Sequence, residues 1–593
     1  MNAHEKKIKD ILNGARLLEI PYYQRSYVWN EELWKRFLED VIDLTLPSAK
    51  PHFFGSIILK QQQTPAMGGV SDIRTVIDGQ QRLTTIAIFF KVLSLKLGQD
   101  WIFEDVCKCR SIINGKSTMV LAFCHNRLDR PAFERIMNLT SLENLSVDKK
   151  GNVVESDSQI INAYQYFLRE IDTTILDINS VAPVLDKILL VGIDLTYDED
   201  EQQIFDTINS LGIKLTTSEL LKNYLFNENN LNEFKAYWEP IFEKDREYKE
   251  YWDQEIVSGT SRPHLIDVFF SALLNMKVHD AKYRVTTEDK LRYARTEKLF
   301  ESYKEFINKY MGGNKHTLMK EIKEYATLFK ENLKPDCGED ALTEEVGLDR
   351  LNVMMFSLKM STMIPYMLYL LVNQKDKNEI TKICEYLEAY MMRRLICHVD
   401  TRSYNKMYSD SLLTNSILTL KDLQEFVNGK DSDRLTAPVD DVDIQKAING
   451  GVYLINEQNT GILYMLETRL RSDSYSATVM KGIKYYTLEH LMPKKWKQTW
   501  GMTGLNDATI QNRDDILYTL GNLAIIPGKL NTSISNSKWQ DKLNGKGNKP
   551  GLIKAASGLI TLDKYLKITD WDENEITKRA NDLYVQILNV WKK

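Results

Sequence analysis

The long helical stretch in the middle of the chain constrains the fold most. From about residue 155 to about residue 430, apolar residues recur at helical spacing, as in NEITKICEYLEAYMMRRLICHV (378–399). Short polar linkers such as YMGGNKH (310–316) interrupt this pattern. The sequence therefore predicts an α+β protein that is predominantly helical, with mixed structure at its two ends.

The N-terminal end mixes strands and helices. FFGSIILK (53–60) and RTVIDG (74–79) read as strands, and the polar, Gly-containing segment between them predicts a hairpin. QQRLTTIAIFFKVLSLKLG (80–98) then reads as a helix that is buried on most sides and closed by Gly98.

The C-terminal end has a strand, strand, helix order. A strand-like run carries His490, a second spans 516–527 and ends in a Pro-Gly turn, and a polar helix follows from about 529 to 543. The polar segment 427–443 marks the boundary before this ββα unit. Because a soluble domain holds about 100–200 residues, we expect three parts, with bounds 1–228, 229–440 and 441–593.

Composition excludes several classes of protein. The net charge of −5 implies no global attraction to nucleic acid, and the six cysteines do not form the dense framework of a small secreted domain. The charged N-terminus lacks the apolar core of a signal peptide, and the apolar run 363–372 is too short to span a bilayer. We expect a soluble cytoplasmic protein with no membrane partner.

Charge is locally basic in the last part of the chain. Residues 481–554 hold 12 Lys and Arg against 5 Asp and Glu. A surface that faces phosphates has this composition, because Lys and Arg displace counterions from a polyanion. Charge alone does not distinguish such a surface from a solvated basic face.

His490 stands in YYTLEHLMPKKW (485–496), in a chain with only eight histidines. Histidine can deprotonate water near neutral pH, and a hard divalent cation would take oxygen ligands from nearby carboxylate or amide groups. Glu489 and His490 point to opposite faces of a strand unless it ends or bends, which Pro493 favours. The alternative is a packing histidine in the core.

The DGQQR string (78–82) lies where a strand ends and a helix begins. Unpaired backbone N–H groups at a helix start attract an anion, and Gly79 allows close approach of the backbone. Arg82 can grip a phosphate, and Asp78 can hold a metal or orient water. The alternative is a structural ion pair at a turn. No Walker GxxxxGK[ST] pattern occurs in the chain.

The C-terminal stretch resembles the His-Me finger (HNH) nucleases, and more closely the nuclease domain of GmrSD-type modification-dependent restriction enzymes. The residues that carry the resemblance follow one another in order: Glu489, His490, Pro493, Gly521-Asn522-Leu523, Asn531, Asn536 and Lys542. It implies that His490 is the general base, that Asn522 holds the loop carrying it, and that Asn531 is a metal ligand. Glu489 would be a second metal ligand or would shape the metal site. Lys494, Lys495 and Lys497 are expected to contact DNA phosphates, while for Asn536 a functional role and a place on the helix surface remain open.

The N-terminal strings resemble the ParB-like domain of the same enzymes, which is associated with nucleotide binding and hydrolysis. The matched positions are Ile20, Pro21, Tyr23, Gln24, Arg25, Tyr27, Trp29, Asp78, Gly79, Gln80, Gln81, Arg82, Asn209, Gly212, Leu215 and Lys222. The resemblance implies that Asp78 to Arg82 bind the nucleotide. It implies that Tyr23, Gln24, Arg25 and Tyr27 sense DNA, although an aromatic core cluster is the alternative for the tyrosines. Arg393-Arg394 and Tyr404-Asn405 resemble the helix before the nuclease, where DNA contact, domain coupling and a buried ion-pair network are alternatives.

Taken together, the resemblance implies a Type IV restriction endonuclease of antiphage defence. Its N-terminal domain would bind and hydrolyse a nucleoside triphosphate, with GTP, UTP, CTP and ATP not distinguished. Its C-terminal domain would nick or cut double-stranded, modified phage DNA with Mg²⁺ or Mn²⁺. A homodimer, a ParB-like DNA-binding regulator with a non-catalytic C-terminal domain, and an RNA-cleaving toxin remain alternatives.

Overall fold

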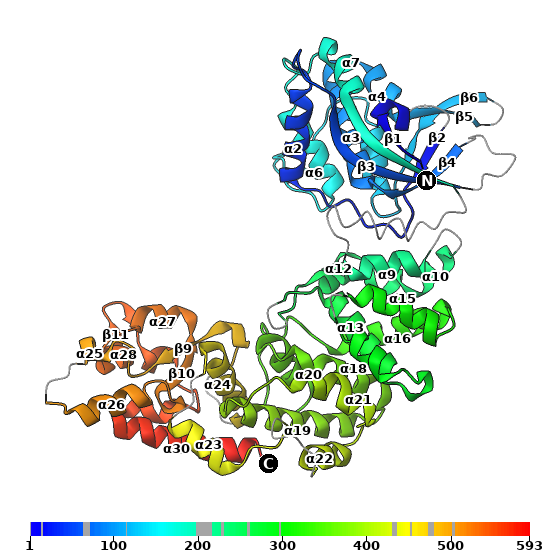
Figure 1. Ribbon diagram of the computed structural model, residues 1–593. Helices are drawn as coiled ribbons and strands as arrows, with labels where there is room; N and C mark the ends of the chain where they lie inside the picture. Colours follow the sequence, from blue (N-terminus) through cyan, green and yellow to red (C-terminus); the bar gives the residue numbers. More distant parts are fainter. Residues whose placement is uncertain are drawn as a thin grey trace. The chain divides into compact units, whose positions relative to one another are not determined.

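The computed structural model describes most of the chain as two compact units, residues 1–234 and 235–593 (Figure 1). The segments outside the description are 1, 13–15, 63–71, 114–115, 197–215, 227–229, 258–260, 296–297, 430–435, 451–453, 472–478 and 501–503. Asn209, Gly212 and Leu215 of the matched N-terminal positions lie outside the described residues. The helical part predicted as 229–440 shares the second unit with residues 441–593.

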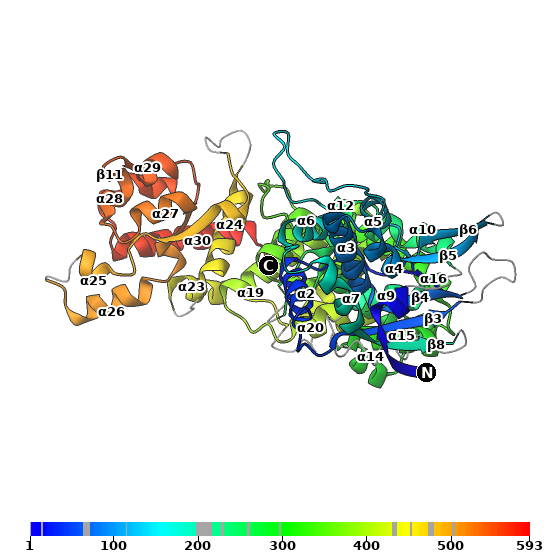
Figure 2. The ribbon, with the colours of Figure 1, turned by 90° about the horizontal axis from the view of Figure 1, so that it is seen from above.

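A mixed six-stranded sheet organises the described residues of the first unit. Its order is β1-β8-β3-β4-β2-β7. The strands are β1 (Asn2–Lys7), β2 (Arg16–Glu19), β3 (His52–Gln61), β4 (Asp72–Asp78), β7 (Phe123–Cys124) and β8 (Ile188–Leu195). β3 pairs antiparallel with β4 and parallel with β8, so the predicted hairpin is confirmed, and Figure 2 shows these three strands side by side.

Helices and a separate hairpin, β5 (Lys108–Ile113) with β6 (Lys116–Leu121), complete the first unit. Its helices are α1 (Ile8–Leu12), α2 (Glu31–Asp43), α3 (Gln80–Leu97), α4 (Asp100–Cys107), α5 (Arg130–Met137), α6 (Gln159–Glu170), α7 (Ile178–Lys187) and α9 (Thr217–Leu225). α3 is buried almost throughout and packs on α4 and α6, as its apolar sequence predicts. Gly98 closes it with φ of 62°.

Strand β8 is a correction to the sequence prediction. Residues 188–195 fall in the stretch read as mainly helical, yet they form a strand between β1 and β3. The run ILLVGIDL is buried at most positions, and periodicity cannot separate a short apolar strand from a buried helical segment.

The second unit begins with helices, as predicted. They are α11 (Glu239–Phe242), α12 (Arg246–Asp253), α13 (Leu265–His279), α14 (Thr287–Tyr293), α15 (Leu299–Tyr310), α16 (Lys315–Asn332), α17 (Leu348–Asn352), α18 (Ile364–Asn373), α19 (Lys377–Ile396), α20 (Tyr404–Lys406), α21 (Leu412–Thr414), α22 (Leu420–Asn428), α23 (Asp441–Asn449) and α24 (Asn456–Leu470). α10 (Leu231–Tyr237) spans the division between the units. α13 and α18 pack together and carry fully buried apolar side chains, so they form part of this unit's core.

The C-terminal end contains the predicted strand, strand, helix order. Its elements are β9 (Tyr486–His490), α25 (Trp496–Thr499), α26 (Asp507–Ile516), η8 (Leu520–Asn522), β10 (Leu523–Pro527), α27 (Gly528–Ile534), α28 (Trp539–Asn544), β11 (Gly545–Lys546), β12 (Lys549–Pro550), α29 (Leu552–Ala555), η9 (Asp563–Lys567) and α30 (Glu573–Val590). The strand predicted over 516–527 is shorter than expected, because α26 and the η8 turn take its first half. The helix predicted from about 529 to 543 is two helices, since α27 ends at Ile534 and α28 begins at Trp539.

Candidate active site and nucleotide site

The antiparallel hairpin of β9 and β10 positions the candidate base. His490 is the last residue of β9 and pairs with Leu523, while Glu489 pairs with Ala524. This register places Asn522 directly beside the turn that follows His490. Residues that the sequence separates by about thirty positions therefore meet at one end of the hairpin.

His490 is buried, with 7% of its surface exposed. Its ring lies edge-on to Tyr518, with 5.5 Å between centroids. Burial, aided by the positive charges of Lys494 and Lys542, lowers the pKa of His490 to about 3. The imidazole is therefore neutral at neutral pH, which is the form that can accept a proton.

Asn522 has no exposed surface and holds the segment after His490 in place. Its Oδ1 accepts hydrogen bonds from the Met492 amide (2.7 Å) and from Trp571 Nε1 (3.1 Å). Its Nδ2 donates to the carbonyls of Met492 (3.0 Å) and Leu517 (2.8 Å). The side-chain amide thus mimics a backbone partner and fixes the exit of β9.

Glu489 forms a buried ion pair with Lys542 of α28. Lys542 Nζ also donates to the backbone carbonyl of His490 at 2.7 Å. Burial raises the pKa of Glu489 and lowers the pKa of Lys542, while each partner's charge opposes that shift. The sequence motif includes Lys542 but does not indicate this role, because no spacing rule connects two residues 53 positions apart.

Asn531 lies in α27 and faces β9. Its Nδ2 donates to the Leu488 carbonyl at 2.8 Å and to Thr487 Oγ1 at 3.1 Å. Thr487 and Glu489 are two residues apart in the strand, so they lie on the same side of the hairpin as Asn531. That side carries the amide oxygen of Asn531, the carboxylate of Glu489 and the hydroxyl of Thr487.

This donor set suits a hard, hydrated cation. The described residues contain no group of three or more His, Cys, Asp or Glu side chains able to hold a metal ion. Mg²⁺ keeps several waters and needs only one or two protein oxygens, so Glu489 and Asn531 fit such an ion. Lys542 would then be the hydrogen-bond partner that orients the ligating carboxylate.

The predicted DNA-contacting lysines are all exposed. Lys497 pairs with Asp514 at 2.7 Å, and Lys494 lies 5.8 Å from the centre of the Tyr518 ring, beside His490. Asn536, whose role the sequence leaves open, is exposed between α27 and α28. These side chains are accessible to a polyanion.

In the first unit, the DGQQR string forms the turn from β4 into α3. Gly79 caps α3 with φ of 95°, and a Cβ there would lie 3.1 Å from the Ser56 carbonyl oxygen and 3.2 Å from Ile57 Cα. Glycine is therefore required both by its backbone conformation and by the closeness of β3. As a glycine, this N-cap residue offers no side chain to cap the α3 N-terminus.

Arg82 and Asp78 lie together at this turn, 3.7 Å apart. Arg82 Nη1 also donates to the Ser56 carbonyl at 3.0 Å. A Cβ on Gly55, whose φ is 112°, would approach Arg82 Nε to 2.6 Å, so this glycine makes room for the guanidinium. The structural ion pair considered as an alternative is present, and both side chains stay over a quarter exposed.

The two glutamines hold the 24–28 segment against α3. Gln80 Nε2 donates to the Arg25 carbonyl at 3.1 Å. Gln81 accepts from the Val28 amide at 2.8 Å and donates to the Ser26 carbonyl at 3.1 Å. The structure thus joins the residues predicted for nucleotide binding to those predicted for DNA sensing.

Side chains in the segment have different environments. Tyr23 and Tyr27 are each 3% exposed, and the Tyr27 hydroxyl bonds to Thr85 and Trp34 in the core. This burial favours the aromatic-core alternative for both tyrosines, and their part in DNA sensing stays a prediction. Gln24 is buried and donates to the Ile77 carbonyl, while Arg25 lies 4.0 Å from Glu219.

A small polar group around His125, which no sequence motif marked as functional, lies beside this segment. His125 Nε2 lies 3.0 Å from Thr84 Oγ1, Asn126 Nδ2 donates to the Arg25 carbonyl, and Asp129 accepts from the Tyr27 amide. Burial lowers the pKa of His125 to about 3. Only the adjacency of polar residues after a short strand could have signalled this group.

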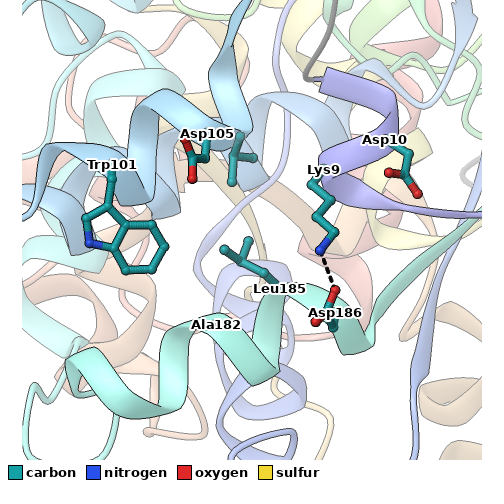
Figure 3. A pocket seen from close by; sticks show the side chains of 8 residues that line it. Lys9, Asp10, Trp101, Asp105, Ala182, Leu185 and Asp186 are labelled. Carbon is teal, nitrogen blue, oxygen red and sulfur yellow. Dashed lines mark hydrogen bonds and ion pairs between the residues drawn. The ribbon is translucent and has the colours of Figure 1, made fainter.

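A separate cavity of about 540 Å³ opens between α1, α4 and α7 in the first unit (Figure 3). None of the predicted site residues lines it. The cavity is lined by three carboxylates, those of Asp10, Asp105 and Asp186, and by one cation, Lys9. Lys9 Nζ donates to Asp186 Oδ1 at 2.5 Å. This charge disfavours a nucleoside triphosphate as an occupant.

The fold and the hairpin define a class: an α+β, predominantly helical protein with a histidine-bearing ββα unit near its C-terminus. Two family models match the chain, the GmrSD restriction endonuclease N-terminal domain over residues 8–226 and the GmrSD restriction endonuclease C-terminal domain over residues 440–585. The search of curated proteins found no match. The chain belongs to the GmrSD restriction endonuclease family, whose substrate is DNA. In its described part, no helix has the length and apolar character needed to cross a membrane.

Arg393 and Arg394, for which the sequence leaves three roles open, are buried in α19. Arg393 donates to the Val439 carbonyl and to Asp441, and Arg394 donates to the hydroxyl of Tyr404. The buried network favours the structural alternative, in which these arginines join the helical region to the segment before the hairpin.

Proposed function

We propose that this chain is a modification-dependent endonuclease that nicks or cleaves double-stranded phage DNA with a divalent cation, under the control of a nucleotide bound to the first unit. The observation that carries the proposal is the hairpin end. There Asn522 anchors the segment that follows a neutral His490, and Glu489, the adjacent residue of β9, and Asn531 of α27 supply oxygen donors at the same hairpin.

In this mechanism His490 is the general base. A phosphate brought beside it would raise its pKa, because a nearby negative charge favours the imidazolium. The imidazole takes a proton from water, the water oxygen attacks phosphorus, and the bond to the leaving oxygen breaks. Lys494, Lys495 and Lys497 would hold the DNA backbone near the hairpin.

Glu489 and Asn531 would hold the cation. When bound, it would supply positive charge against the phosphate and the leaving oxygen. Lys542 keeps the Glu489 carboxylate in place and anchors the carbonyl of His490. Asn522 holds the segment that follows His490 through its hydrogen bonds to the Met492 backbone.

Nucleotide binding is proposed at the start of α3. The α3 N-terminus, whose N-cap residue Gly79 has no side chain, offers backbone N–H groups to a phosphate. Arg82 offers a cation for the phosphate, and Asp78 offers a carboxylate for its counterion. Gln80 Oε1 is buried and has no hydrogen-bond partner among the described residues, which supports a ligand donor at this turn. Because Gln80 and Gln81 also hold the 24–28 segment, nucleotide binding would reach that segment directly.

Cleavage of a substrate panel tests the proposal. Phage DNA with glucosylated hydroxymethylcytosine, phosphorothioate DNA, unmodified DNA and RNA are each incubated with Mg²⁺ or Mn²⁺, with and without each nucleoside triphosphate. We expect one modified DNA to be cleaved in preference, at a rate that a nucleotide changes. Cleavage of RNA alone would favour a toxin, and DNA binding without any cleavage would favour a regulator.

A further inference from the structure

The last helix of the chain places a buried arginine against the turn that carries Asn522. Arg579 of α30 has no exposed surface. Its Nη1 donates to the carbonyls of Leu520 (3.1 Å), Gly521 (2.8 Å) and Leu523 (2.7 Å), and its Nε donates to that of Thr561 (3.0 Å). In Figure 1, α30 lies along α23 and α26, and it packs on the η8 turn.

The turn is shaped to accept this helix. A Cβ on Gly521 would lie 2.3 Å from the Ile576 carbonyl oxygen and 2.9 Å from Ala580 Cβ, so only glycine permits the approach. The Leu520 carbonyl also accepts the Leu523 amide, and a cation beside the carbonyls at the end of a helical turn is favourable. The described contacts of Arg579 include no carboxylate ion pair, although burying a charge is expensive without compensation.

A second buried side chain holds Asn522 itself. Trp571, just before α30, donates its Nε1 to Asn522 Oδ1 at 3.1 Å and stacks on Trp539, with 5.1 Å between ring centroids. The same Oδ1 accepts the amide of Met492, two residues after His490. Direct hydrogen bonds therefore run from the α30 region through the turn to the segment carrying the candidate base.

We propose that Arg579 and Trp571 are positioning residues for His490: together they fix the 520–522 turn, through which Asn522 holds the exit of β9. The inference rests on the proposed nuclease function, and it goes further by assigning the last helix to the active site. The role is distinct from general core packing, because the contacts converge on the carbonyls and the amide that anchor the base.

Trp571→Phe is the sharpest variant, because it keeps the buried ring and removes the donor to Asn522. We expect kcat on the DNA that the wild type cleaves best to fall about 10–100-fold, as for other partners that orient active-site groups, with the Kd for that DNA unchanged. Arg579→Lys, which keeps the charge but cannot reach three carbonyls, should lower kcat in the same way.

Trp252→Phe is the matched control. Trp252 is equally buried in the same unit and donates its Nε1 to the Ile241 carbonyl at 2.8 Å, without contact to the hairpin. We expect it to lose comparable thermal stability while keeping kcat. Equal loss of kcat in both variants, or wild-type kcat in Trp571→Phe, would overturn the inference.

Hydrogen exchange separates this inference from the proposed function. Peptides covering residues 488–496 should exchange faster in Trp571→Phe than in the wild type, and at the wild-type rate in Trp252→Phe. Unchanged exchange in Trp571→Phe would overturn the positioning role even if the chain cleaves no substrate tested. Failure of the wild type to cleave DNA would count against the nuclease function alone.

Discussion

At the scale of single residues, the pair of Lys542 and Glu489 distinguishes this site from an isolated histidine in a strand. The sequence pointed to His490 because Pro493, the Gly-Asn-Leu run and Asn531 follow it in order. It could not reveal that a buried lysine from α28 neutralises the adjacent carboxylate and bonds to the His490 carbonyl. Such a contact depends on tertiary packing, which spacing does not encode.

Removing that lysine should therefore destabilise the second unit. Lys542→Met leaves the Glu489 carboxylate buried without a partner, which we expect to cost roughly 3–5 kcal/mol. The double variant Lys542→Met/Glu489→Gln should recover part of this loss, because no buried charge remains. Chemical denaturation of the three proteins measures the effect, and a double variant less stable than Lys542→Met would contradict it.

A buried histidine in the first unit predicts a pH dependence. The folded-state pKa of His125 is about 3, below the usual histidine value of 6.5, because burial disfavours the charged form. Between these values the unfolded chain binds more protons than the folded one, so stability falls as pH drops below about 6.5. The loss is at most about 1.4 kcal/mol per pH unit.

His125→Gln should flatten this dependence. We expect the Tm of the first unit to fall less between pH 7.5 and pH 5 in the variant than in the wild type. His52→Gln serves as the control, because the side chain of His52, the first residue of β3, is 46% exposed. An acid sensitivity in His125→Gln equal to that of the wild type would show that another group is responsible.

At the scale of elements, the sequence predicted well where local signals were strong. Gly98 ends α3 and β3 pairs antiparallel with β4, as expected. β8 and the break between α27 and α28 were missed, because a short apolar strand lacks its own periodicity and a polar segment gives no helix-breaking signal at Ser535. Tertiary packing decides both.

The tight turn before α3 gives a prediction of its own. Gly79→Ala adds a methyl group in a left-handed conformation and 3.1 Å from the Ser56 carbonyl oxygen. A left-handed backbone conformation alone costs an L-residue about 1–2 kcal/mol, and we expect the loss of stability in Gly79→Ala to exceed this amount. We also expect the variant to bind nucleotide more weakly. Gly98→Ala is the control, since its φ is 62° and a Cβ there meets nothing within 4 Å.

Nucleotide titration and thermal unfolding of these two glycine variants provide the measurement. Gly98→Ala should lose only the stability that the left-handed backbone conformation costs an alanine. It should bind nucleotide like the wild type. If both variants bind nucleotide equally well, the close approach at Gly79 does not shape the site.

At the scale of the whole molecule, one chain carries both family domains, and the structure links two sets of residues that the sequence could only treat separately. Gln80, predicted to bind the nucleotide, donates to the backbone of Arg25, predicted to sense DNA, and Gln81 donates to the backbone of the neighbouring Ser26. We therefore expect nucleotide and modified DNA to affect each other's binding to the first unit. By linkage, the factor by which one changes the affinity for the other must be the same in both directions.

Arg82→Ala tests this coupling. The variant should weaken nucleotide binding, since it removes the cation at the α3 start, and it should make the affinity for modified DNA independent of nucleotide. Fluorescence anisotropy with a modified duplex, at zero and saturating nucleotide, measures the effect. An unchanged nucleotide effect in Arg82→Ala would place the nucleotide elsewhere.

The central claim is that His490 is the base of a DNA-cleaving site, and a direct comparison of wild type with His490→Ala tests it. Both proteins are incubated with the preferred modified DNA and Mg²⁺ or Mn²⁺, and strand breaks are followed with time. We predict that wild type cleaves and that His490→Ala is slower by about 100-fold or more, with equal DNA affinity, because a general base contributes at least this factor. Cleavage by His490→Ala at the wild-type rate would contradict the account.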